Sequence, residues 1–252
     1  TASYSVGENL SQKDFSAVPA DELEDLIRSI KVLSRRLSAH LNRRYKHSEK
    51  VNLPDLRRTI RKNMRHGGEL FDIAFKKPKR NRTKLVLVCD VSKSMDLYAS
   101  FLLQFMFAFQ QVFGRIETFA FSTSLENITH LLKQNDFTTT LRSLGARESS
   151  WSGGTKIGES LNELVKKYAP LLNKRTIVII FSDGWDTGEI PLLQQSMELI
   201  HKRSKKVIWL NPLAGYASYR PDVGGMKAAI PYVDVFAPVH NLDSLRKLSR
   251  WL

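Results

Sequence analysis

The sequence predicts an α/β fold, in which a doubly wound, mainly parallel sheet carries helices on both faces and a basic helical extension precedes it. Two observations predict this fold. From residue 84 onward, apolar segments of strand length alternate with segments of helical periodicity, the order typical of a doubly wound sheet. Before residue 84, the chain combines helical periodicity with an excess of basic residues. We therefore expect a basic helical extension over residues 1–83 and an α/β domain over residues 84–252.

The expected strands are continuous apolar runs, as in sheets that are covered on both faces. They span residues 84–90, 116–122, 128–132, 176–183, 206–211 and 232–238. The expected helices between them span residues 97–113, 155–169, 191–204 and 241–252. The segment 97–113 is apolar, but it is shorter than the roughly 20 residues of a spanning helix and contains three glutamines. We therefore expect it to be a buried helix, and we expect no membrane span.

The extension carries most of the net charge of +14. Residues 1–84 contain 20 Lys and Arg against 10 Asp and Glu, whereas residues 85–252 contain 19 against 15. Within the extension we expect amphipathic helices at 20–46 and 53–67 and a basic linker at 76–84. Basic surfaces attract phosphate backbones, so a nucleic-acid-binding protein is the alternative interpretation. Few aromatic side chains lie among these basic residues, which disfavours stacking on single strands.

The single cysteine, Cys89, excludes an internal disulfide and a cysteine metal cluster. It lies within an apolar run, so we expect a small core residue. One cysteine agrees with a reducing compartment, and residues 1–12 lack the pattern of a signal peptide. We therefore expect a cytoplasmic protein, although a targeting segment upstream of Thr1 stays open.

Two expected strands end in a carboxylate, Asp90 and Asp183, and hydroxyl side chains accompany them. Ser92 and Ser94 follow the first carboxylate at alternate positions, and Thr155 follows a Gly-Gly pair at an expected helix start. The carboxyl ends of parallel strands meet at one edge of a sheet, where ligands bind. Oxygen ligands of this kind suit Mg²⁺. Each motif alone also has an ordinary explanation, as a helix cap or as a turn.

Two carboxylates would balance a divalent ion and leave it able to accept a carboxylate from another protein. Such a site binds a partner's Asp or Glu and does not require hydrolysis. A phosphohydrolase with Asp90 as nucleophile is the enzymatic alternative. However, the residue two positions later is Ser92 rather than a second carboxylate, and the chain has no Gly-x-x-x-x-Gly-Lys loop. We therefore expect a binding module without enzymatic activity.

The motifs DVSKSM (90–95), GGTKIG (153–158) and FSDGWDTGE (181–189) resemble the metal-ion-dependent adhesion site of von Willebrand factor type A (VWA) domains. Residues 56–73 and 209–245 extend the resemblance to the CoxE-like family, so that it covers about residues 55–252. The resemblance implies that a divalent cation, Mg²⁺ or another such as Mn²⁺ or Ca²⁺, contacts a set of five residues directly or through water. They are Asp90, Ser92, Ser94, Thr155 and Asp183.

The resemblance also implies a partner, a MoxR-type AAA+ ATPase, with which such a protein remodels or activates a target that is often a metalloenzyme. Four further residues lie beside the motifs: Lys93, Trp151, Trp185 and Asp186. We expect them to shape a rim that contacts the partner, and loop packing is the equally weighted alternative for the tryptophans and Asp186. Lys93 would weaken metal binding if it pointed inward.

Overall fold

The computed structural model describes residues 11–42, 45–64, 72–78, 82–134, 137, 139 and 154–252. The chain forms two compact units. The α/β unit contains Thr1–Leu37 and Thr83–Leu252, and the small basic unit contains Ser38–Arg82. The α/β unit thus resumes next to the expected boundary at residue 84, but it also includes the residues before Ser38.

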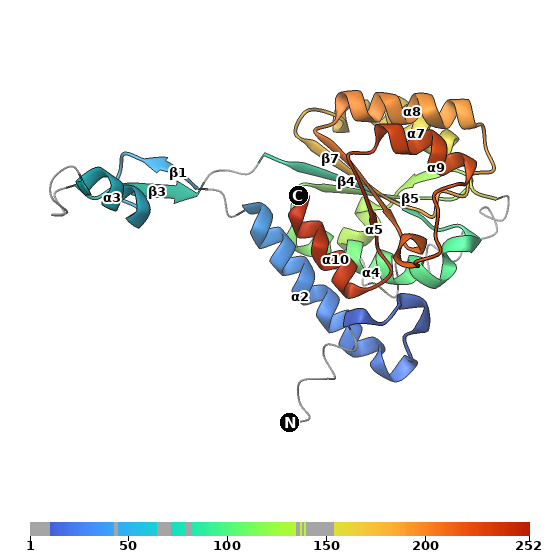
Figure 1. Ribbon diagram of the computed structural model, residues 1–252, viewed down its shortest axis with the longest axis horizontal. Coiled ribbons are helices and arrows are strands. Elements are labelled where there is room, and N and C mark those ends of the chain that lie inside the picture. Colours follow the sequence, from blue (N-terminus) through green and yellow to red (C-terminus); the bar gives the residue numbers. More distant parts are fainter. Residues whose placement is uncertain are drawn as a thin grey trace. The chain divides into compact units, whose positions relative to one another are not determined.

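A six-stranded sheet with the order β6-β5-β4-β7-β8-β9 forms the centre of the α/β unit (Figure 1). Its strands are β4 (Lys84–Asp90), β5 (Ile116–Phe121), β6 (Leu125–Asn127), β7 (Thr176–Phe181), β8 (Lys206–Asn211) and β9 (Val235–Pro238). All neighbours pair in parallel except β6, which runs antiparallel to β5. The expected doubly wound, mainly parallel sheet is confirmed. The chain leaves β4 for β5 and later returns to the other side of β4 as β7, so the topological switch point lies between β4 and β7.

Helices cover both faces of this sheet (Figure 1). Helices α7 (Ile157–Lys167), α8 (Ile190–Arg203) and α9 (Gly224–Ala229) lie on one face. On the other face lie α4 (Asp96–Val112), α5 (Thr129–Gln134), α10 (Leu242–Lys247) and the first part of α2 (Leu23–Asn42). The expected strand at 128–132 is therefore wrong, because most of this segment belongs to α5. Asn127 ends β6 just before this helix, and its side chain accepts a hydrogen bond from the N–H of Thr129, the first helical residue (2.9 Å).

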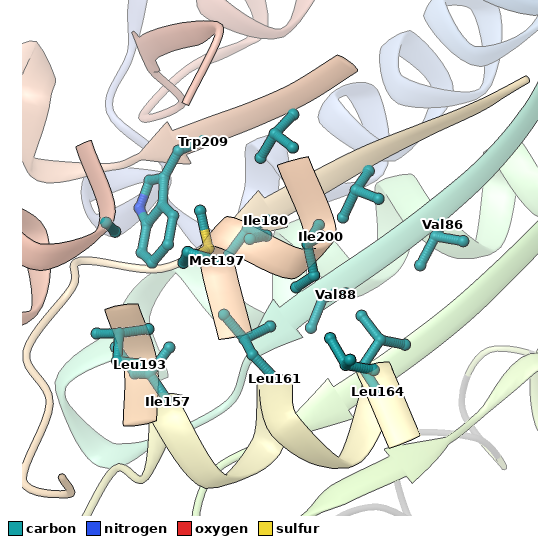
Figure 2. Packing of buried hydrophobic residues seen from close by; sticks show 14 of the residues in the cluster. Val86, Val88, Ile157, Leu161, Leu164, Ile180, Leu193, Met197, Ile200 and Trp209 are labelled. Atoms are coloured by element: carbon teal, nitrogen blue, oxygen red, sulfur yellow. The ribbon is translucent and has the colours of Figure 1, made fainter. Parts of the chain in front are cut away.

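The main core lies between the sheet and helices α7 and α8 (Figure 2). Figure 2 shows side chains of both helices packed against those of β4, β7 and β8. Trp209 of β8 is fully buried there, and its indole N–H donates to the Ser182 carbonyl oxygen (2.9 Å). On the other face, Phe105 of α4 packs against Phe181 of β7 with ring centroids 6.4 Å apart. Helix α4 is thus buried, as expected. In the described part of the chain, no helix is long and apolar enough to cross a membrane.

The described residues of the small basic unit form a three-stranded antiparallel sheet and helix α3, after the last residues of α2. The strands β1 (Tyr45–Ser48), β2 (Leu53–Pro54) and β3 (Phe75–Pro78) pair in the order β1-β3-β2, and α3 spans Leu56–Asn63. Strand β1 lies where we expected the end of helix 20–46, and β3 lies where we expected a linker. Strands β1 (YKHS) and β3 (FKKP) consist mostly of polar residues. Neither has the alternation of apolar and polar residues from which a strand is predicted. Residues 65–67 of the expected helix 53–67 lie outside the described residues.

Candidate metal-binding site

The two strand-end carboxylates lie at the switch point of the sheet. In the β4–β7 ladder Cys89 pairs with Phe181, so the residues that follow, Asp90 and Ser182, are neighbours across the two strands. Asp183 comes one residue later. Asp90 is 0% exposed and Asp183 is 4% exposed. The expectation that both carboxylates reach the same edge of the sheet therefore agrees with the topology.

Asp90 is held by two hydrogen bonds in a buried position. Its Oδ1 accepts from the Ser92 N–H (2.9 Å), and its Oδ2 accepts from the Ser182 hydroxyl (2.7 Å). Burial raises the pKa of Asp90 to about 7, and the charge of Asp183 also raises this pKa, while the bonds from Ser92 and Ser182 lower it. Among the described residues, no Lys or Arg forms an ion pair with either carboxylate.

This environment fits a cation. Burying a carboxylate without a counter-charge is unfavourable, and a bound cation would remove that cost and favour the ionised form. The oxygen donors around the two carboxylates are of the kind that Mg²⁺ accepts. The described residues contain no group of three or more His, Cys, Asp or Glu that could hold a metal ion. A metal here would therefore depend on the hydroxyl side chains as well as on the two carboxylates.

The serine hydroxyls lie close to one another and do not serve as helix caps. The hydroxyl oxygens of Ser92 and Ser94 are 3.2 Å apart. Ser92 precedes the short 3₁₀ helix η4 (Lys93–Met95), but its side chain makes no capping hydrogen bond, and the N-cap of α4 is Met95. The capping explanation therefore does not account for these two serines.

Thr155 is tied to the loop after β7 through its main chain. Its carbonyl oxygen accepts from both the N–H and the hydroxyl of Thr187 (2.8 Å each). Thr155 is 5% exposed and does not cap α7, whose N-cap is Lys156. Among the residues that the structure describes, no hydrogen bond joins the Thr155 hydroxyl to Asp90, Asp183, Ser92 or Ser94. The structure thus links Thr155 to the Asp183 loop but shows no direct contact with Asp90.

Asp183 opens a tight turn. Its Oδ1 accepts from the Trp185 N–H (2.9 Å), so the turn explanation holds for one of its oxygens. Gly184 has φ +81°, and a Cβ at this position would lie 2.2 Å from the Met226 Sδ. Only glycine combines the left-handed conformation with the missing side chain. The Asp183 carbonyl oxygen also accepts from the Asn211 side-chain amide (2.9 Å).

Two residues that support this site were not predicted, Ser182 and Asn211. Ser182 donates to Asp90 and accepts from the Gly184 N–H (3.0 Å). Asn211, at the end of β8, binds the Asp183 carbonyl oxygen and the Tyr219 hydroxyl (2.9 Å each). Both are polar residues at the carboxyl end of a central strand, and that position is the signal that could have identified them.

The four expected rim residues differ in their surroundings. Lys93 is exposed, so its charge lies in solvent, and Trp185 is 61% exposed. Asp186 is half-buried, and its Oδ1 accepts from the N–H groups of Ile157 and Gly188 (3.0 Å each), so it holds the loop to the start of α7. Trp151 lies outside the described residues.

Comparison with known proteins gives a family and several similar structures. The chain is similar to BatB from Bacteroides thetaiotaomicron (16% identity, TM-score 0.42, covering 67% of this chain and 96% of that one). It is also similar to a von Willebrand factor type A protein from Catenulispora acidiphila (16% identity, TM-score 0.42, covering 70% of this chain and 43% of that one). A third similar structure is proximal thread matrix protein 1 from the mussel byssus, with a zinc-occupied MIDAS motif (17% identity, TM-score 0.41, covering 67% of this chain and 44% of that one). The match thus covers less than half of the last two chains. A search of functionally described proteins gave no significant match.

The match that identifies the family is that of a family model. It describes a VWA domain containing CoxE-like protein and matches residues 27–245, which include the whole candidate site. The expected resemblance is thereby confirmed, and the chain belongs to the family of CoxE-like proteins that contain a VWA domain.

Proposed function

We propose that this chain is a protein-binding module that depends on a divalent metal ion. In this proposal Asp90, Ser92, Ser94, Thr155 and Asp183 hold the ion. A partner protein then supplies an Asp or Glu as a further ligand. The observation that carries the proposal is the buried pair Asp90 and Asp183 at the switch point, which no described Lys or Arg neutralises.

The ion supplies a positive charge that attracts an external carboxylate, and the chain's residues determine how it is held. The Ser92 N–H and the Ser182 hydroxyl fix the orientation of Asp90, and the turn at Gly184 fixes that of Asp183. The two carboxylates would balance the charge of a divalent ion, and the ion could still accept a third carboxylate from a partner as a further ligand. The hydroxyl oxygens add ligands without adding negative charge, which keeps the ion attractive to a partner's acid.

The exposed surface beside the site supports a protein as the partner. Leu97, in the first turn of α4, is 62% exposed, and Trp185, two residues after Asp183, is 61% exposed. Large exposed apolar side chains are typical of protein interfaces. We infer that the recognised Asp or Glu is flanked by apolar residues, which would pack on Leu97 and Trp185.

Membership of the CoxE-like family supports a more specific version of this function. In that version the partner is a MoxR-type AAA+ ATPase, and the pair remodels, matures or activates a target protein, such as a metalloenzyme, in the cytoplasm. The chain would act as an adaptor and would not itself be an enzyme. ATP hydrolysis would come from the partner, since this sequence has no Gly-x-x-x-x-Gly-Lys loop.

Titration calorimetry with Mg²⁺ tests the metal site directly. We expect the wild-type chain to bind Mg²⁺ and Asp90→Ala to lose measurable binding, whereas Asp25→Ala, which removes an exposed carboxylate of α2, should bind as the wild type does. Equal affinity in Asp90→Ala and the wild type would refute the site. A pull-down with the purified ATPase, with and without EDTA, then tests the partner, and an interaction that EDTA does not change would refute the metal-dependent contact.

A further inference from the structure

Helix α3 of the small basic unit exposes an apolar stripe. Leu56, Ile60 and Met64 are spaced four residues apart, so they share one side of the helix and its C-cap. They are 71%, 58% and 71% exposed. Leu53 and Ile73, in the segments on either side of the helix, are 45% and 58% exposed. We call the stripe of Leu56, Ile60 and Met64 the α3 apolar surface.

The same helix packs on its own unit with polar side chains. Thr59 and Asn63 are 4% and 1% exposed. The Thr59 hydroxyl oxygen accepts from the Ala74 N–H (3.0 Å), and Asn63 exchanges two hydrogen bonds with the main chain of Asp72 (2.7 and 3.0 Å). An amphipathic helix normally buries its apolar side and exposes its polar side. This reversal means that the fold of the unit does not use the α3 apolar surface.

Arginine side chains border this surface. Arg57 and Arg61 each follow a residue of the stripe, and Arg58 lies beside them on the solvent side of the helix. Among the described residues, none of these arginines has an acidic partner, whereas Lys62 pairs with Asp72 (2.6 Å). The sequence of the unit, residues 38–82, contains 14 Lys and Arg against 4 Asp and Glu, which is +10 of the total +14.

Charge and shape exclude most occupants of this surface. Two copies of a unit that carries +10 would repel each other. Nucleic acid would neutralise the arginines but would leave the apolar stripe in water. A helix that lies in a bilayer carries cations along its polar face, but here one border of the stripe holds the packed Thr59 and Asn63 and the acidic Asp72. An acidic protein surface with an apolar centre satisfies both the stripe and the arginines.

We propose that the small basic unit docks an acidic amphipathic helix of a partner protein. Apolar residues of that helix would cover Leu56, Ile60 and Met64, and its Asp and Glu side chains would pair with Arg57 and Arg61. This docking site needs no metal ion and is independent of Asp90.

The test uses the full 252-residue chain and a fluorescein-labelled peptide probe. The probe is a synthetic helix with Leu at every third and fourth position and Glu between them, and its control is a scrambled peptide of the same composition. Fluorescence anisotropy should show binding of the probe at least about tenfold tighter than that of the scrambled peptide, a ratio that corresponds to about 1.4 kcal/mol. Leu56→Ser/Met64→Ser should weaken binding about tenfold, while Leu23→Ser, an exposed apolar residue of the α/β unit, should leave it unchanged.

A second measurement reports the surface without relying on affinity. The only cysteine, Cys89, is fully buried, so a maleimide dye should label an Ile60→Cys variant selectively. The probe should slow labelling at position 60 but not in Ser100→Cys, an exposed site on α4. Asp90→Ala should bind the probe like the wild type, which separates this proposal from the metal site.

Four outcomes would overturn the proposal. They are no binding of the probe, equal binding of the scrambled peptide, slow labelling of Ile60→Cys in the free chain, and no effect of Leu56→Ser/Met64→Ser. Tighter binding to phosphatidylserine vesicles or to duplex DNA than to the probe, with the same dependence on Leu56 and Met64, would also overturn it in favour of those occupants.

Discussion

The buried carboxyl group of Asp90 makes the stability of the metal-free protein depend on pH. Its pKa is about 7 in the folded chain, against 3.8 for an ordinary Asp, chiefly because of burial. Because the folded pKa is the higher one, this group stabilises the fold fully below about pH 3.8 and loses that contribution as the pH rises through about 7. The whole difference corresponds to about 4 kcal/mol, at about 1.36 kcal/mol per pH unit.

We therefore expect metal-free wild-type protein to lose about 2–3 kcal/mol of Asp90-dependent stability between about pH 5 and about pH 8. Asp90→Asn keeps the shape of the side chain and removes the titrating group. Between the same two pH values, the loss of stability in Asp90→Asn should be smaller than that in the wild type, and the difference should equal the Asp90-dependent contribution. Other groups also titrate in this interval, so the difference between the two proteins is the quantity that tests Asp90.

Magnesium should act in the opposite direction. At about pH 8 Asp90 is mostly ionised, and Mg²⁺ at about a hundred times its dissociation constant should stabilise the fold by about 2.7 kcal/mol. At about pH 5 a proton occupies the carboxyl group, which weakens the apparent affinity about a hundredfold and leaves less than about 1 kcal/mol at the same Mg²⁺ concentration. Asp90→Asn should gain much less from Mg²⁺ at either pH.

Urea denaturation at several pH values, with either EDTA or Mg²⁺, measures these differences. Fluorescence can follow the core, because Trp209 is fully buried there. The reasoning is refuted if metal-free wild type and Asp90→Asn show the same pH dependence. It is also refuted if Mg²⁺ stabilises both proteins equally at about pH 8.

Two further predictions concern residues that support the site. Ser182→Ala removes the hydroxyl that donates to Asp90, so the pKa of Asp90 should rise further. Calorimetry at neutral pH should then show that the Mg²⁺ affinity falls several-fold. An unchanged affinity would contradict this role of Ser182. Gly184 has φ +81°, and the Cβ of Gly184→Ala would lie 2.2 Å from the Met226 Sδ. The left-handed conformation alone costs an alanine about 1–2 kcal/mol. Together with the steric overlap, we expect urea denaturation to show a destabilisation of about 2–4 kcal/mol. Gly114→Ala, where a Cβ would meet nothing within 4 Å, is its control, and equal effects of the two substitutions would contradict the argument.

The central sheet could be predicted from the sequence because its strands are buried on both faces. Such strands are continuous apolar runs, and the expected limits of β4 and β8 match the structure. The short run at 128–132 is different, since three or four apolar residues fit a strand and a helix equally well. In the structure the Asn127 side chain bonds the first helical N–H, and Ile128 and Leu132, which are four residues apart, are both buried; a run of five residues is too short for this spacing to be distinguished from a strand.

Prediction of the candidate site was limited by interactions between distant segments. The strand-end positions of Asp90 and Asp183 follow from local sequence. The role of Ser182 depends on the register between β4 and β7, and that of Asn211 depends on the neighbouring β8. Asp186 was expected either at the rim or in loop packing, and its hydrogen bond from the Ile157 N–H at the start of α7 connects residues about thirty positions apart.

The two proposed binding surfaces share a physical feature, which is a local departure from what would stabilise the free chain. At the proposed metal site, the sheet buries two carboxylates whose ionised forms a cation would compensate. On α3, the helix buries Thr59 and Asn63 and leaves Ile60 in water. Each arrangement is less stable in isolation than an apolar core or a polar surface would be, and each becomes favourable when a ligand of the matching chemistry binds. A cation and a partner's acid would complete the first, and an acidic amphipathic helix would complete the second. Such departures from local consistency are typical of functional sites.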